Sequence, residues 1–220
     1  SCERVGESGA SQKIHFFWDK PVSFAKILDA IGELPIPPYL NRETEEKDKQ
    51  TYQTVYSRIQ GSVAAPTAGL HFTEKELLAL SDKAVNLHVG AGTFKPVKSE
   101  TSEGHDMHTE FISVPKSVIE NILKHIKSSE APLVAVGTTS VRTLESLFYI
   151  GYKLSQNPEA SAEELIVHQW EPYDFSYSLT EIEELENIIA YLEKTGEENL
   201  VTATQILIAP GFQYRLVKAM

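Results

Sequence analysis

Apolar residues recur every three or four positions along four stretches of the chain, which is the spacing of residues on one face of a helix. Signals for helix ends accompany them. Gly32 closes the first stretch, Thr73 and Glu76 form a capping-box pattern before the second, and Pro115 suits the first turn of the third. The pattern therefore predicts helices at about residues 24–31, 73–80, 115–126 and 182–192.

Short apolar runs between these stretches indicate strands. The run Leu133–Val136 is continuously apolar, which is typical of a strand buried on both faces, and it leads through Gly137 into a fifth helix that includes Val141. Alternating strands and helices predict an α/β domain with a largely parallel sheet and flanking helices. The four expected strands lie at residues 14–18, 84–89, 133–136 and 205–208.

The formal net charge of −11 argues against a histone-like protein or a basic tail. The charge is, however, concentrated in one place. Residues 159–198 hold twelve acidic residues and a single lysine, Lys194, so this stretch alone accounts for the whole net charge. The rest of the chain is balanced and can meet a polyanion.

Cysteine content and hydropathy exclude several classes of protein. A single cysteine, Cys2, allows no internal disulfide framework, no cysteine-rich zinc site and no three-cysteine iron–sulfur cluster. No apolar run approaches the roughly 20 residues of a membrane helix, and no signal peptide is recognisable. We expect a cytoplasmic protein with no membrane partner.

Three loops rich in glycine and hydroxyl residues are the candidate sites, since ligands of α/β sheets bind at the loops that follow strands. The first, 61–72, is almost uncharged but carries His71 beside an aromatic residue. The second, 88–97, contains Gly-x-Gly but has Lys95 where a dinucleotide fingerprint needs its third glycine, so a Rossmann site is excluded. A plain glycine-rich turn between strands remains the alternative there.

The third loop, 137–142, places three hydroxyls and free backbone N–H groups at a helix start, with Arg142 one turn further on. This arrangement suits a carboxylate or phosphate, because the helix terminus supplies donors and Arg binds such groups in a two-pronged manner. An ordinary Ser/Thr cap with a surface arginine is the alternative. His105 and His108 have the spacing His-x-x-His, but without a helical His-Glu-x-x-His arrangement or cysteine ligands we expect no metal site.

Taken together, these strings closely resemble the S-adenosylmethionine:tRNA ribosyltransferase-isomerase family of queuosine biosynthesis. The resemblance covers about residues 31–150 densely and extends to 205–220. The matching strings, in the family's order, are residues 34–39, 52–56, 61–73, 88–97, 105–108 and 135–146.

The resemblance implies an enzyme that uses S-adenosylmethionine as a ribosyl donor. Such an enzyme transfers and isomerises the ribosyl group onto 7-aminomethyl-7-deazaguanine at the wobble position of tRNA, giving epoxyqueuosine. S-adenosylmethionine is then a co-substrate, no prosthetic group is needed, and we expect a monomer. The family fold implies that residues 1–20 are the tail of a small β-barrel domain and residues 21–220 an α/β catalytic domain.

Site roles follow from combining the resemblance with the loops. His71 and His88 are the candidate bases for removing a proton beside the sulfonium. Phe72 or Phe94 would stack on adenine, and the carboxylate of methionine would bind the third loop. The full substrate-binding set is Gly69, Phe72, Gly90, Gly92, Thr93, Phe94, Gly137, Thr138, Thr139, Ser140 and Arg142, and the candidate contacts to the tRNA backbone are Lys95, Lys98, His105 and His108.

Two departures from the family pattern leave alternatives open. The chain stops at Met220 before a segment that the family normally carries, so we expect a truncated chain. The stretch at about 153–200 is longer and more acidic than the family's connection, which predicts an acidic insertion. A paralogue that binds S-adenosylmethionine but modifies a non-tRNA nucleobase or small molecule is the alternative function. A noncatalytic interaction module built on the acidic helix would leave the glycine loops unexplained.

Overall fold

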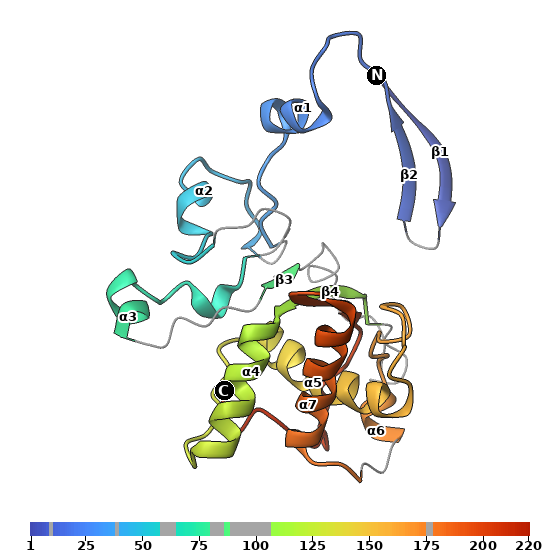
Figure 1. Ribbon diagram of the computed structural model, residues 1–220. Coiled ribbons are helices and arrows are strands. Elements are labelled where there is room, and N and C mark those ends of the chain that lie inside the picture. Colours follow the sequence, from blue (N-terminus) through green and yellow to red (C-terminus); the bar gives the residue numbers. More distant parts are fainter. Residues whose placement is uncertain (9–10, 38–39, 58–64, 80–85, 89–106, 175–177) are drawn as a thin grey trace. The chain divides into compact units, whose positions relative to one another are not determined.

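The computed structural model describes residues 1–8, 11–37, 40–57, 65–79, 86–88, 107–174 and 178–220 (Figure 1). The chain divides into two compact units, Ser1–Leu34 and Pro35–Met220. Gly90, Gly92, Thr93, Phe94, Lys95, Lys98 and His105, which the sequence nominates as site residues, lie outside the described residues.

The first unit is a β-hairpin followed by one helix. Strands β1 (Cys2–Ser8) and β2 (Ser11–Phe16) pair antiparallel, and helix α1 (Phe24–Ile31) begins at Ser23, whose hydroxyl accepts a hydrogen bond from the N–H of Lys26. The ring of Phe24 lies 5.0 Å from that of Phe16, which joins the helix to the hairpin. The expected helix is confirmed, whereas two paired strands do not make a barrel, so the barrel assignment stays a prediction.

Three short helical segments begin the second unit. They are α2 (Asp48–Thr51), a 3-10 turn (Thr67–Gly69) and α3 (Glu74–Ala79). The capping box before α3 is confirmed, because the N–H of Thr73 donates to the Glu76 carboxylate at 2.8 Å and the N–H of Glu76 donates to the Thr73 hydroxyl at 3.3 Å.

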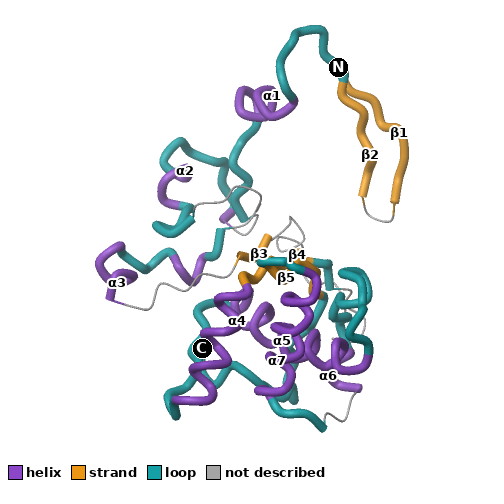
Figure 2. The backbone as a smooth tube through the Cα atoms, in the orientation of Figure 1, coloured by secondary structure: helices purple, strands orange, loops and turns teal. Residues whose placement is uncertain are grey.

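The remainder is a two-layer arrangement of a small sheet and helices, visible in Figure 2. Antiparallel strands β3 (Asn86–His88), β4 (Glu110–Pro115) and β5 (Asn199–Thr204) form the sheet in the order β3-β4-β5. Alternate residues of β4 are buried, whereas Phe111 between them is 65% exposed. The helices therefore cover one face of the sheet. The covering helices are α4 (Lys116–Ser128), α5 (Thr138–Gln156) and α7 (Glu181–Thr195), and the short helix α6 (Glu171–Asp174) lies between α5 and α7 in the chain.

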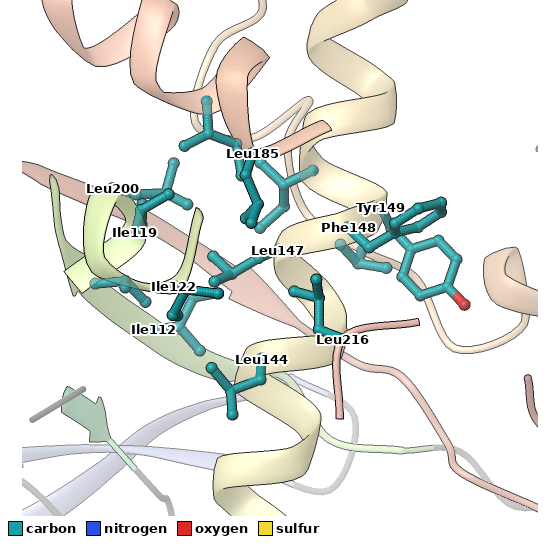
Figure 3. Close-up of a cluster of buried hydrophobic side chains, with 14 of the residues drawn as sticks. Ile112, Ile119, Ile122, Leu144, Leu147, Phe148, Tyr149, Leu185, Leu200 and Leu216 are labelled. Carbon is teal, nitrogen blue, oxygen red and sulfur yellow. The ribbon is translucent and has the colours of Figure 1, made fainter. Parts of the chain in front are cut away.

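The hydrophobic core lies between this sheet and helices α4, α5 and α7 (Figure 3). Each element contributes the apolar side of its pattern, and removing these side chains from water is the main stabilising contribution. Helix α7 lies inside the acidic stretch, yet Leu185, Ile188 and Leu192 are buried and most of its glutamates are not. The central side chains include Ile112, Ile119, Leu147, Leu185, Ile188, Leu192 and Leu200.

The mixed α/β class is confirmed, but the largely parallel sheet is wrong for the strands that the structure describes. Those strands pair antiparallel, and the run 133–136 forms one parallel bridge, between Val134 and Ala219. Val134 and Val136 are 56% and 44% exposed, so this run is not buried on both faces. An apolar run looks the same in sequence whether its valines face a helix or solvent.

The expected strand 205–208 is also wrong, because β5 ends at Thr204. The observed strand β5 precedes the expected one and shows the alternation of a strand with one buried face, since Leu200 and Thr202 are buried and Val201 is 58% exposed. Residues 205–207 instead run beside 167–169, where the N–H of Gln205 donates to the carbonyl of Val167 at 2.8 Å.

Candidate functional site

Glu110, the first residue of β4, is a buried carboxylate whose side chain is 1% exposed. Burying a charge is costly unless it is paired and hydrogen-bonded. The pairing comes from α5, where Nη1 of Arg142 donates to Oε2 of Glu110 at 2.5 Å. Nε of Arg142 donates to the carbonyl of Ile206 at 3.0 Å, so the guanidinium joins β4, α5 and the segment after β5.

His108 occupies the second oxygen of the same carboxylate. Its Nε2 lies 2.8 Å from Oε1 of Glu110, and its side chain is 29% exposed. An ionised carboxylate only accepts hydrogen bonds, so Nε2 carries the hydrogen and Nδ1 carries the lone pair. Within the described residues Nδ1 has no hydrogen-bond partner.

Arg142 brings a buried positive charge to this cluster. Burial lowers the pKa of its guanidinium, and the negative charge of Glu110 opposes that effect. The third nitrogen, Nη2, is buried and has no hydrogen-bond partner among the described residues. One nitrogen of the guanidinium is thus left over, while Nη1 and Nε each make a hydrogen bond.

Backbone and amide contacts fix the segment that carries His108. The N–H of Met107 donates to Oε1 of Gln169 at 2.8 Å, and Nε2 of Gln205 donates to the hydroxyl of Thr109 at 2.7 Å. Gln205 also contacts Nδ1 of His168 at 3.0 Å through its carbonyl oxygen. The residues on both sides of His108 are therefore held to 168–169 and 205.

The third loop forms a glycine turn at the start of α5. Gly137 has a φ of 88°, a conformation that favours glycine, and no side chain of the described residues caps the first turn. The Ser140 hydroxyl instead donates backward to the carbonyl of Val136 at 2.8 Å. Thr138 is exposed and Thr139 is half-buried. The backbone N–H groups of the turn, more than its hydroxyls, are the available donors.

The first loop meets the third at Gly137. A Cβ added there would lie 3.2 Å from Cβ of Ala68, in the 3-10 turn. Gly69 is buried, and a Cβ there would overlap the hydroxyl of Tyr56. Both glycines are therefore favoured by the close approach of protein atoms, and the approach of a ligand to the first loop stays a prediction.

The candidate bases differ in their surroundings. His71 is exposed, and the described residues offer it no hydrogen-bond partner. His88 ends β3, where it pairs in register with Phe111. Phe72, beside His71, is half-buried. The catalytic and stacking roles of these residues stay predictions.

The structure shows the surroundings of Arg142 and His108 and adds Glu110, a residue that the sequence did not point to. Arg142 is buried and is not a surface arginine, and Glu110 and the carbonyl of Ile206 each occupy one of its three nitrogens. His108 and Glu110 stand two positions apart, so on an extended chain they share a face. The sequence signal for Glu110 was a glutamate at the start of a mostly apolar strand. Its partner could not be read from the sequence, because Arg142 is 32 residues away.

Comparison with known proteins identifies the family. A sequence model of the family described as queuosine biosynthesis protein matches residues 2–220. The chain belongs to the queuosine biosynthesis protein family. This result confirms the family that the glycine loops resemble, and family membership implies a transferase with a role in queuosine synthesis. No solved structure matches the chain.

No group of three or more His, Cys, Asp and Glu residues in the described part of the chain is arranged to hold a metal ion. None of the helices in that part is both long and apolar enough to cross a bilayer.

Proposed function

We propose that the protein transfers and isomerises the ribosyl group of S-adenosylmethionine onto 7-aminomethyl-7-deazaguanine in tRNA, in the cytoplasm. The products are epoxyqueuosine in tRNA, adenine and methionine. S-adenosylmethionine acts as co-substrate, and no prosthetic group takes part. The observation that carries the proposal is the family match over residues 2–220, which includes all three glycine loops.

The start of α5 would bind the carboxylate of the methionine moiety. Among the described residues no side chain caps the backbone N–H groups at Thr138, Thr139 and Ser140, and the positive end of the helix dipole favours an anion there. Arg142 would add its buried charge and the one donor, Nη2, that has no partner among the described residues. A contact through Nη2 alone binds a carboxylate less strongly than a two-pronged contact would, but it leaves the ion pair between Arg142 and Glu110 intact.

The other substrate contacts come from the first two loops. Phe72 or Phe94 would stack on adenine, beside Gly69, Gly90, Gly92 and Thr93, and Lys95, Lys98 and His105 would face the tRNA backbone. A histidine would remove the proton beside the sulfonium, whose positive charge stabilises the electron pair left on carbon.

Release of adenine tests the proposal directly. Purified protein is incubated with S-adenosylmethionine and with tRNA that carries the aminomethyl-deazaguanine precursor, and adenine is quantified by chromatography. We expect adenine release that requires the precursor tRNA and is absent with tRNA carrying guanine. Adenine release that does not depend on RNA would favour a paralogue acting on a non-tRNA nucleobase or small molecule, and no adenine release would contradict both.

A further inference from the structure

We propose that His108 is the proton-accepting group of the reaction and that Glu110 is its positioning residue, an inference that rests on the proposed function. Four observations carry it. The Glu110 carboxylate is buried, both of its oxygens are bonded, His108 is partly exposed, and the neighbours of His108 in the chain are held in place.

The carboxylate of Glu110 is fixed from two sides. Arg142 holds Oε2 at 2.5 Å and is itself anchored by its bond to the carbonyl of Ile206. Oε1 is then left facing Nε2 of His108 at 2.8 Å. A general base whose ring is oriented by a third group is the arrangement that activates histidine in many enzymes.

The hydrogen bond selects one tautomer of His108. With its hydrogen on Nε2, the ring presents the lone pair of Nδ1, which is the atom that no described residue occupies. A side chain that is 29% exposed can meet a substrate without leaving its partner. His71, by contrast, is exposed and has no orienting group among the described residues, so nothing there selects a tautomer.

The proton balance of the step is simple. The C–H bond beside the sulfonium breaks, its electron pair stays on that carbon next to the positive sulfur, and the proton goes to Nδ1. The resulting imidazolium carries one positive charge, which the Glu110 carboxylate stabilises through the Nε2 hydrogen bond. The proton can be returned from Nδ1 to a later intermediate, so no oxidant or further reactant is required.

The charged groups around His108 come from three elements. Glu110 lies on β4 and Arg142 on α5, and their charges oppose each other. His168 precedes α6 and reaches the segment through Gln205 and Thr109. Removing the carboxylate of Glu110 leaves Arg142 as the nearest charge, which disfavours the imidazolium of His108.

The experiment measures precursor-dependent adenine release as a function of pH for the wild type and for His108→Gln, Glu110→Gln and Glu110→Asp. His125→Gln is the matched control, because His125 bonds the carbonyl of Ala131 at the end of α4. We expect His108→Gln to lower turnover by about 10²–10⁴-fold. Glu110→Gln should lower turnover and move the rising limb of the pH profile to lower pH, and Glu110→Asp should restore part of the shift.

Imidazole ¹⁵N NMR of the same variants gives a readout that does not depend on turnover. Glu110→Gln should weaken the preference of His108 for the tautomer with its hydrogen on Nε2 and leave the spectrum of His125 unchanged. Wild-type turnover in His108→Gln would overturn the inference and leave the proposed function standing. If Glu110→Gln lowers turnover but leaves the rising limb of the pH profile in place, Glu110 has only a structural role. A wild type that releases no adenine would instead refute the proposed function itself. Since His108 is partly exposed, its variant tests the inference even if Glu110→Gln fails to fold.

Discussion

Gly151 of α5 lies directly against Glu184 of α7. A Cβ built on Gly151 would overlap the carbonyl oxygen of Glu184 and would lie 2.7 Å from its Cβ. Both residues are buried, and Leu185, the next residue of α7, is fully buried in the core. The absence of a side chain at 151 therefore sets how closely the two helices approach.

Gly151→Ala is expected to destabilise the protein by about 1–3 kcal/mol, which is typical of forcing an extra carbon into a packed core. The sign is informative, because alanine in a helix is otherwise favoured over glycine by about 1 kcal/mol. Urea unfolding followed by circular dichroism measures the change. Ser117→Ala on the exposed side of α4 is the control and should alter stability by less than about 0.5 kcal/mol. A stabilised Gly151→Ala would contradict the close approach.

Glu184 makes stability depend on pH. Oε1 has no hydrogen-bond partner among the described residues, and burial raises the pKa of the carboxyl to about 7. Because the folded pKa lies above the ordinary value of 4.5, the contribution of Glu184 to stability is fully present below about pH 4.5 and is lost as the pH rises through 7. Glu184→Gln should match the wild type near pH 5 and exceed it by about 1–3 kcal/mol at pH 8. Urea unfolding at the two pH values measures this difference.

Glu183, the neighbouring residue, provides the control of opposite sign. Its carboxylate accepts hydrogen bonds from the N–H and hydroxyl of Thr180 at 2.7 and 2.9 Å, which lowers its pKa. Its contribution is present above the unfolded pKa and is lost as the pH falls. Glu183→Gln should therefore be less stable than the wild type at pH 8 and approach it in acid. The same trend in both variants would show that a general charge effect dominates.

Sequence patterns predicted the helices better than the sheet. Two of the core helices, α4 and α7, each bury one apolar stripe. Such a stripe can be predicted from the local spacing of apolar residues such as Ile119 and Leu185. Strand pairing depends on which segments meet. Glu110 pairs with Thr204, 94 residues away. Nothing in the local pattern of either strand indicates that the two strands pair, or that they run antiparallel. The parallel sheet failed for this reason.

The candidate site was predictable in the same uneven way. A glycine-rich loop in the sequence predicts that the backbone is closely approached there, as Gly137 is by Ala68. The role of Arg142 does not, because a loop-to-helix motif looks identical whether its arginine faces a ligand or a buried carboxylate from β4. Only the packing of α5 against the sheet decides between those two settings.

The ion pair of Arg142 and Glu110 can be measured by a double-mutant cycle. Arg142→Met alone leaves a buried carboxylate with less compensation, and we expect a loss of about 3–5 kcal/mol in the free energy of unfolding. Adding Glu110→Met removes that uncompensated charge, so the double variant should lose less than the sum of the single losses. Chemical denaturation of all four proteins provides the values. Additive losses would mean that the two side chains do not interact in solution.

Glu145 of α5 anchors the C-terminal segment. Its fully buried carboxylate accepts hydrogen bonds from three consecutive N–H groups, those of Arg215, Leu216 and Val217, at 2.8, 3.0 and 2.7 Å. Leu216 and Val217 are buried beside it, so the carboxylate both satisfies these donors and holds two apolar side chains in the core. Glu145→Ala leaves the three donors unpaired, and we expect a loss of about 2–5 kcal/mol in the free energy of unfolding.

Hydrogen exchange locates the effect of Glu145→Ala within the chain. The N–H groups of residues 215–217 should exchange much faster in the variant, while those in the middle of α5 should change only in proportion to the global loss of stability. Glu164→Ala is the control, since the Glu164 carboxylate also accepts a backbone hydrogen bond, from Ser161 at 2.8 Å, but lies at the surface. Equal acceleration throughout the chain would show that Glu145 stabilises the fold as a whole. Selective acceleration at 215–217 would show that one carboxylate holds the end of the chain against the core.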